Sequence, residues 1–136
     1  MESISIYLSG LPQFFGYFLS AILLTFLYAV IYSKLTPHKE WALIKENVPA
    51  AALAFSGSLL GFVIALASAI SNSVNIVDCW LWGVVALIVQ LATFFSVRMF
   101  MPRISERLSN NEMAAGTWLA AASLGAGILN AASLTY

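Results

Sequence analysis

The chain has 136 residues, of which 61% are hydrophobic and 9% are charged, and its six basic and six acidic residues give a formal net charge of +0. Water-soluble domains carry about 25% charged residues, so this composition excludes an ordinary soluble domain, a disordered chain, a nucleic-acid-binding domain with a basic stripe and a disulfide-stapled secreted module. We therefore expect a single membrane domain over residues 1–136, in contact with membrane lipid and not with nucleic acid.

Four long uncharged stretches lie between the charged residues. Each can supply the roughly 20 apolar residues that carry a helix across about 30 Å of hydrocarbon. The predicted fold class is therefore all-α, a polytopic membrane protein with four transmembrane helices, near residues 11–33, 50–71, 79–100 and 113–134. The first stretch lacks a basic N-terminal region and a small-x-small cleavage site, so we expect it to be retained and not cleaved as a signal peptide.

All six basic residues lie in or beside the first and third connections, whereas the second connection and both ends of the sequence carry none. Basic loops stay on the cytoplasmic side of a membrane. We therefore expect a multi-pass protein of the bacterial inner membrane, with both basic loops cytoplasmic and both termini periplasmic. The basic residues expected to contact anionic lipid or a cytoplasmic partner are Lys34, Lys39, Arg98, Arg103 and Arg107.

Both basic connections are predicted to be partly helical. Thr36 and Pro37 suit the N-cap and first turn of a short helix. The sequence Asn47-Val48-Pro49 then restarts a helix into the second span. In the third connection, Ile104 and Leu108 would share one face of another short helix.

The two halves of the chain align at a constant offset of 64 residues. The informative pairs are Lys34 with Arg98, Lys39 with Arg103, Asn47 with Asn111, and Gly61 with Gly125. This pattern predicts two tandem helical-hairpin repeats, one over about 8–72 and the other over about 73–136. Because each repeat holds two spans, both would insert in the same direction, as parallel repeats.

Small residues recur every fourth position in the second and fourth predicted spans. Such ridges let helix backbones approach closely in lipid. The residues expected at helix-packing or oligomer interfaces are Gly57, Gly61, Ala65, Ala121, Gly125 and Gly127. These ridges could serve only to close one four-helix bundle. Since the fourth span has more small faces than one neighbour needs, we expect a homo-oligomer.

The polar residues inside the spans are uncharged, and the largest are Gln90 and Asn130, joined by Ser56 and other serines and threonines. Their usual role is interhelical hydrogen bonding. The absence of an ionisable residue near the bilayer centre argues against a proton-coupled pump. A pore lined by Ser56, Gln90 or Asn130 stays open as an alternative.

Catalytic chemistry has few candidates in this sequence. His38, the single histidine, has Glu40 nearby but no evident nucleophile, so a surface or capping role is expected. Cys79, the single cysteine, is expected to be an unreactive packed thiol. We predict no enzyme activity, no catalytic residue, no cofactor and no metal site.

Several short strings resemble a known family. They include Ile31-Tyr32-Ser33-Lys34, Thr36-Pro37-His38, Met101-Pro102, Ala114-Ala115-Gly116 and Asn130-Ala131-Ala132. On these strings the chain resembles the small bacterial inner-membrane proteins of the YjfL type, a domain-of-unknown-function family. The resemblance implies a four-span protein built from a repeated two-span unit, with no established activity. It also implies an envelope-related protein partner, because relatives are often encoded near proteins of the phage-shock-protein-A type.

The leading hypothesis is a non-enzymatic inner-membrane subunit. It would associate with copies of itself through its glycine and alanine faces, and its basic loops would dock a cytoplasmic or envelope-related partner or anionic lipid. The alternative is an oligomeric channel or transporter-like pore for ions or small solutes.

Overall fold

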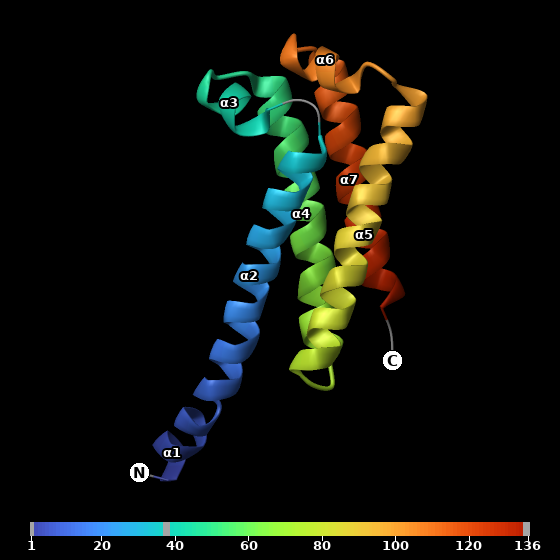
Figure 1. Cartoon of the computed structure of the whole chain (residues 1–136). Helices are drawn as coiled ribbons and strands as arrows, with labels where there is room; N and C mark the ends of the chain where they lie inside the picture. The colour runs from blue at the N-terminus through green and yellow to red at the C-terminus, as the bar shows by residue number, and fades with distance from the viewer. Residues whose placement is uncertain (1, 37–38, 135–136) are drawn as a thin grey trace.

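The computed structural model describes residues 2–36 and 39–134, and every regular element in these ranges is an α-helix, so the predicted all-α class is confirmed there (Figure 1). Long helices alternate with short ones. In chain order the helices are α1 (Glu2–Ser9), α2 (Leu11–Leu35), α3 (Glu40–Lys45), α4 (Pro49–Asn72), α5 (Ile76–Phe100), α6 (Ile104–Ser109) and α7 (Met113–Ser133).

Three segments within the described residues are long and apolar enough to cross a membrane, namely Ile4–Leu35, Pro49–Asn72 and Ile76–Phe100. They contain the first three predicted spans, 11–33, 50–71 and 79–100, and the first segment begins earlier than predicted, at Ile4. The fourth predicted span, 113–134, forms the 21-residue helix α7, which is not among these three segments. Its many glycines, alanines and serines, together with Asn130, make α7 less apolar than the other long helices.

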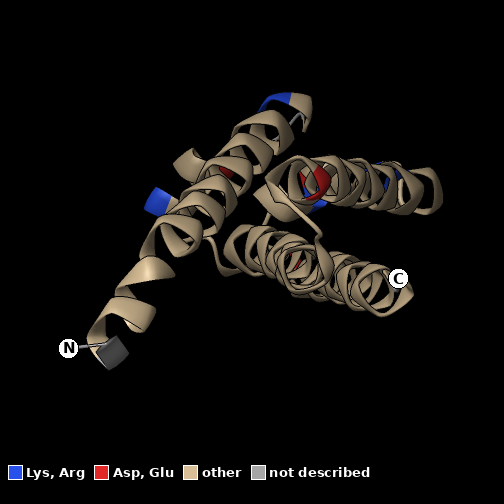
Figure 2. Cartoon of the chain, turned by 90° about the horizontal axis from the view of Figure 1, so that it is seen from below, with Lys and Arg blue, Asp and Glu red and all other residues tan. Residues whose placement is uncertain are grey.

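The two short helices α3 and α6 lie at one end of the molecule, while α1 and the end of α7 point toward the other (Figure 1). Helices α4 and α7 therefore both begin at the α3–α6 end and run parallel to each other. All six basic residues belong to α3, α6 or the segments that adjoin them. Seen from below, most of the ribbon carries no charged residue, and lysine, arginine, aspartate and glutamate occupy only short stretches (Figure 2).

Helix α2 contacts the other helices along a narrow stripe. Its buried residues, Ser20, Leu24, Tyr28 and Tyr32, recur every fourth position, which places them on one helix face. Tyr28 stacks on Phe62 of α4, with ring centroids 4.5 Å apart. Before residue 20 the side chains of α2 are exposed or half-buried, and this half diverges from α4 and α5 (Figure 1).

The helices α3 and α6 end in the same way. The residue after each C-cap, Asn47 or Asn111, has a left-handed backbone, with φ of 63° and 57° respectively. Asn47 donates its N–H to the Ile44 carbonyl, and Asn111 donates to that of Leu108, at 3.0 and 3.1 Å. Asparagine is one of the few residues that tolerate this conformation. The turn redirects the chain into α4 or α7.

The predicted N-cap of α3 was wrong. Thr36 is instead the C-cap of α2, where its N–H donates to the Tyr32 carbonyl. Its hydroxyl donates to the Glu40 carboxylate, which holds it away from an N-cap position. Lys39 is the N-cap of α3. Pro37 and His38 lie outside the described residues.

Replacing Asn111 with glycine should destabilise the fold more than replacing Asn47 with glycine. Glycine accepts the left-handed backbone at both positions, so the pair isolates the side chain. The Asn111 Oδ1 accepts a hydrogen bond from the Ala50 N–H at the start of α4, at 3.0 Å, and such a bond contributes about 1 kcal/mol. Thermal unfolding in detergent, followed by circular dichroism, measures the difference. Equal melting temperatures for the two variants would contradict the stabilising role of this bond.

Candidate functional site

The contact between α4 and α7 is the closest approach of two helices in the described structure, and it depends on residues without side chains. A Cβ added to Gly57 would lie 2.5 Å from the Ala120 Cα. A Cβ added to Gly61 would overlap the Ser123 carbonyl oxygen, and one added to Gly127 would overlap the Gly61 carbonyl oxygen. The two backbones therefore touch directly, as small-residue ridges allow in lipid.

Gly116, which was not among the predicted packing residues, extends this contact. A Cβ there would lie 2.6 Å from the Ala50 carbonyl oxygen. Gly116 and Ala120 stand four residues apart and precede Ser123 and Gly127 on the same ridge. Extending that small-residue spacing toward the start of the helix was the signal that could have identified Gly116.

A second ridge of α7, formed by Ala121 and Gly125, has no partner among the residues that the structure describes. A Cβ added to Gly125 would meet no atom within 4 Å, and Ala121 is exposed. The predicted packing residues therefore divide into two groups. Gly57, Gly61 and Gly127 lie in the α4–α7 contact and Ala65 is buried on α4, whereas Ala121 and Gly125 face outward.

Gln90 links three helices inside the protein. It is completely buried on α5, and its Nε2 donates hydrogen bonds to the Ser58 carbonyl of α4 and the Ser123 carbonyl of α7, each at 3.1 Å. The Ser58 hydroxyl is itself hydrogen-bonded to the Tyr28 hydroxyl of α2. A chain of polar contacts thus connects all four long helices through their apolar interior.

The predicted intramembrane polar residues do not converge. Ser56 is exposed on α4, Gln90 is buried between helices, and Asn130 is half-buried near the end of α7. Within one chain, these three side chains therefore line no common surface. A polar contact of the kind expected for such residues does join α4 to α7, because the Ser68 hydroxyl donates to the Ala131 carbonyl at 2.8 Å.

The basic residues at the α3–α6 end are mostly accessible. Lys34, Lys39, Arg98 and Arg103 are exposed. Arg107, the fifth predicted contact residue, donates from Nε to the Glu112 carboxylate at 3.0 Å. The exposed basic side chains could approach an anionic surface, whereas part of the charge of Arg107 is already balanced.

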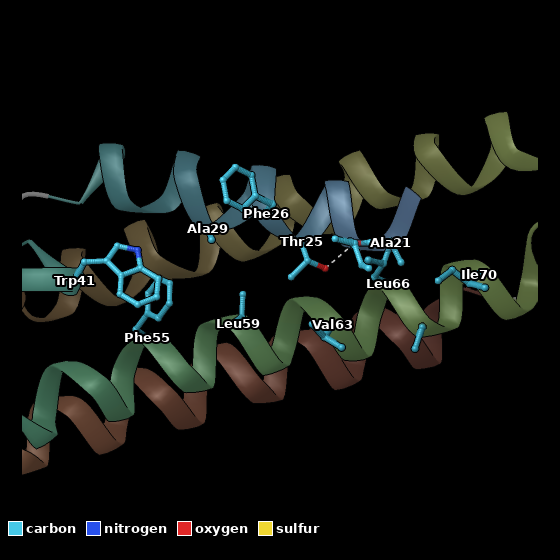
Figure 3. A pocket seen from close by; sticks show the side chains of 12 residues that line it. Ala21, Thr25, Phe26, Ala29, Trp41, Phe55, Leu59, Val63, Leu66 and Ile70 are labelled. Atoms are coloured by element: carbon cyan, nitrogen blue, oxygen red, sulfur yellow. Dashed lines mark hydrogen bonds between the residues drawn. The ribbon is translucent and has the colours of Figure 1, made fainter. Parts of the chain in front are cut away.

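An apolar groove runs between α2 and α4 (Figure 3). It has a volume of about 450 Å³. Among the lining residues that α2 and α4 contribute, Thr25 is the one with a polar side chain, and its hydroxyl donates to the Ala21 carbonyl at 2.8 Å. Trp41 of α3 lines the end of the groove nearest the basic residues. A groove of about 420 Å³ between α5 and α7 includes Thr93 and Ser96 in its lining.

The described residues hold no group of three His, Cys, Asp or Glu side chains that could bind a metal ion. Cys79 is buried at the start of α5. His38, with its expected surface or capping role, falls outside the described part of the chain. The described residues thus combine close helix packing with a cluster of exposed basic side chains at one end of the molecule.

Comparison with known proteins gives a consistent picture. Residues 5–134 match the family described as a Domain of Unknown Function, DUF350. The UPF0719 inner membrane protein YjfL of Escherichia coli (strain K12) is 48% identical over 129 residues, covering 95% of this chain and 98% of that protein. The UPF0719 transmembrane protein YshE of Bacillus subtilis (strain 168) is 26% identical over 108 residues, covering 78% and 81%. No solved structure matches significantly.

Gly61 and Gly125 occupy equivalent positions in the two halves but should respond differently to alanine. The added methyl group at position 61 would collide with backbone atoms of α7, and overpacking of this kind costs about 1–3 kcal/mol. The methyl group at position 125 has open space. We therefore expect G61A to lower the unfolding temperature in detergent and G125A to preserve it. The assignment of Gly61 to an internal contact would be wrong if both variants were equally stable.

Proposed function

This chain belongs to the DUF350 family, and we propose that it acts as a non-enzymatic subunit of the bacterial inner membrane that associates with copies of itself. The inner-membrane location is supported by the name of its Escherichia coli relative and by the long apolar helices. The self-association is supported by one observation above all, the unpartnered small-residue ridge of α7.

This ridge resembles the ridge that α7 already uses against α4. Ala121 and Gly125 stand four residues apart on the face that points away from α4. In lipid, where apolar surfaces gain little from leaving the solvent, close van der Waals packing between small residues is a main source of helix association. A second copy could supply the backbone that this face lacks.

The proposed architecture is two parallel repeats, with four spans in all. Its support is the agreement of the element boundaries at the 64-residue offset. Helices α3 and α6 begin at residues 40 and 104, and α4 and α7 begin at residues 49 and 113. The left-handed residues Asn47 and Asn111 obey the same offset. On this proposal α7 crosses the membrane beside α4, and α4 shields the less apolar face of α7 from lipid.

The orientation we propose places α3 and α6 on the cytoplasmic side and both termini in the periplasm. All six basic residues lie at the α3–α6 end, and basic segments stay on the cytoplasmic side. The exposed Lys34, Lys39, Arg98 and Arg103 would then face anionic lipid or an acidic, envelope-related protein partner.

Bulky substitutions on the free ridge should separate the subunits without unfolding them. We expect A121L and G125L to shift the purified protein from an oligomer to a monomer, because the leucines would hold two α7 helices apart. The mass of the protein–detergent complex, measured by light scattering, reports the change. The matched control is S96L, which adds similar bulk to an exposed position on α5. A folded G125L protein with unchanged oligomeric mass would refute the proposed interface.

The number of crossings can be tested at the C-terminus. An alkaline phosphatase fused after Tyr136 should be active, since four spans and cytoplasmic basic loops place this end in the periplasm. The same reporter inserted between Ser109 and Asn110, at the end of α6, should be inactive. An inactive C-terminal fusion in a stably produced protein would show that α7 does not cross and would overturn the four-span proposal.

A further inference from the structure

We propose that the groove between α2 and α4 binds one acyl chain of an anionic phospholipid, with the lipid phosphate held near Lys39. This inference rests on the proposed orientation, in which the α3–α6 end lies at the cytoplasmic membrane surface. It specifies the lipid that the basic end recognises and the place where its tail lies.

The walls of the groove favour a hydrocarbon ligand. The α2 side is formed by residues such as Ala21 and Ala29, and the α4 side by residues such as Leu59 and Val63. Their side chains face the open space (Figure 3). Along the α2 and α4 walls Thr25 is the one lining residue with a polar side chain, and its hydroxyl already donates to the Ala21 carbonyl, so a polar ligand buried there would leave most of its own polar groups unpaired.

The dimensions favour a single chain over a helix. The α4 wall extends from Phe55 to Ile70, which is about 22 Å along the helix axis. One leaflet of a bilayer contains about 15 Å of hydrocarbon, so the groove is long enough for one acyl chain. The open volume is about 450 Å³. A helix about 10 Å across could only cover a groove of this volume from outside, whereas one acyl chain could lie within it. The space therefore suits an acyl chain better than a helix of a second copy.

The basic end of the groove is suited to a lipid headgroup. Trp41 lines both the groove and a neighbouring pocket of about 330 Å³, which Ser33, Lys39, Glu40 and Ala42 also line. Tryptophan favours the membrane interface. Lys39 is exposed, whereas the Glu40 carboxylate is buried and accepts a hydrogen bond from the Thr36 hydroxyl. The charge accessible to a headgroup here is therefore positive, and it complements a phosphate.

The α5–α7 groove supplies an internal comparison. Its volume of about 420 Å³ is similar, and no basic residue lines either groove itself. The difference is that Trp41 joins the α2–α4 groove to the pocket lined by Lys39, whereas no residue of the α5–α7 groove lines that pocket. Bulk added to the α5–α7 groove should leave lipid selectivity unchanged. Ala29 lines the α2–α4 groove and Ala92 lines the α5–α7 groove, so A29W and A92W form a matched pair.

The test is a titration of the delipidated full chain in detergent with phosphatidylglycerol or phosphatidylcholine, with bound lipid counted by native mass spectrometry. We expect one tight phosphatidylglycerol per chain, weakened more than about tenfold by A29W and unchanged by A92W. K39Q should weaken the binding of phosphatidylglycerol about fivefold, as expected for the loss of one basic residue at an anionic headgroup. The binding of phosphatidylcholine should stay unchanged. Inorganic phosphate at millimolar concentration should not displace the lipid.

Wild-type binding of phosphatidylglycerol by a folded A29W protein would overturn the proposal, as would equal weakening by A29W and A92W. Displacement of the lipid by inorganic phosphate alone would show that the site binds anions and not lipids. Equal affinity for phosphatidylglycerol and phosphatidylcholine would show that Lys39 does not recognise the headgroup. Loss of oligomers in A29W with normal lipid binding would assign the groove to a second copy. The substitutions A121L and G125L lie outside the groove. If these variants still form oligomers and still bind lipid, the proposed α7 interface is contradicted and the proposed lipid site is not.

Discussion

The direct backbone contact between α4 and α7 is the constraint on which the rest of the structure depends. It requires that Gly57, Gly61 and Gly127 carry no side chain, and it brings the two helices close enough for Gln90 of α5 to reach a carbonyl on each of them. Helix α2 then packs on this assembled surface through its single buried stripe. The tightest part of the protein is therefore made of its smallest residues, as expected where burial in lipid contributes little to association.

The Nε2 of Gln90 is hydrogen-bonded inside the protein, whereas its Oε1 is buried with no hydrogen-bond partner in the described part of the chain. Its amide nitrogen bonds to two backbone carbonyls that already belong to helices, so its removal would leave those carbonyls with their helical partners. Bonds of this kind contribute about 0.6 kcal/mol on average in membranes. One side chain thus links α5 to both of its neighbours.

Much of the fold could be predicted from the sequence, because charged residues and turn-forming residues mark the ends of apolar segments. The first three spans and the helices of both basic connections were located in this way. The role of Thr36 was mistaken, because a threonine before a proline suits either end of a helix, and the sequence does not show that Glu40, which accepts the Thr36 hydrogen bond, is buried. The membrane crossing of α7 remains a prediction.

The candidate interface was predicted only in part. Spacing identified both small-residue ridges of α7, but periodicity describes one helix at a time and does not state which ridge meets which neighbour. The assignment of Gly127 to α4, and the outward position of Gly125, depend on how four helices rotate together. The groove between α2 and α4 depends on the angle at which α2 leaves its neighbours, which no local pattern encodes.

The diverging half of α2 has a mechanical consequence. The apolar segment Ile4–Leu35 contains 32 residues, which corresponds to about 48 Å of helix and exceeds a hydrocarbon core of about 30 Å. The excess must be taken up by tilting, by bending at the break between α1 and α2, or by local thickening of the bilayer. Because this half is mostly exposed and meets α5 near Gly16 and Ile76, bilayer thickness would influence its inclination, and the protein would respond to the thickness of the membrane around it.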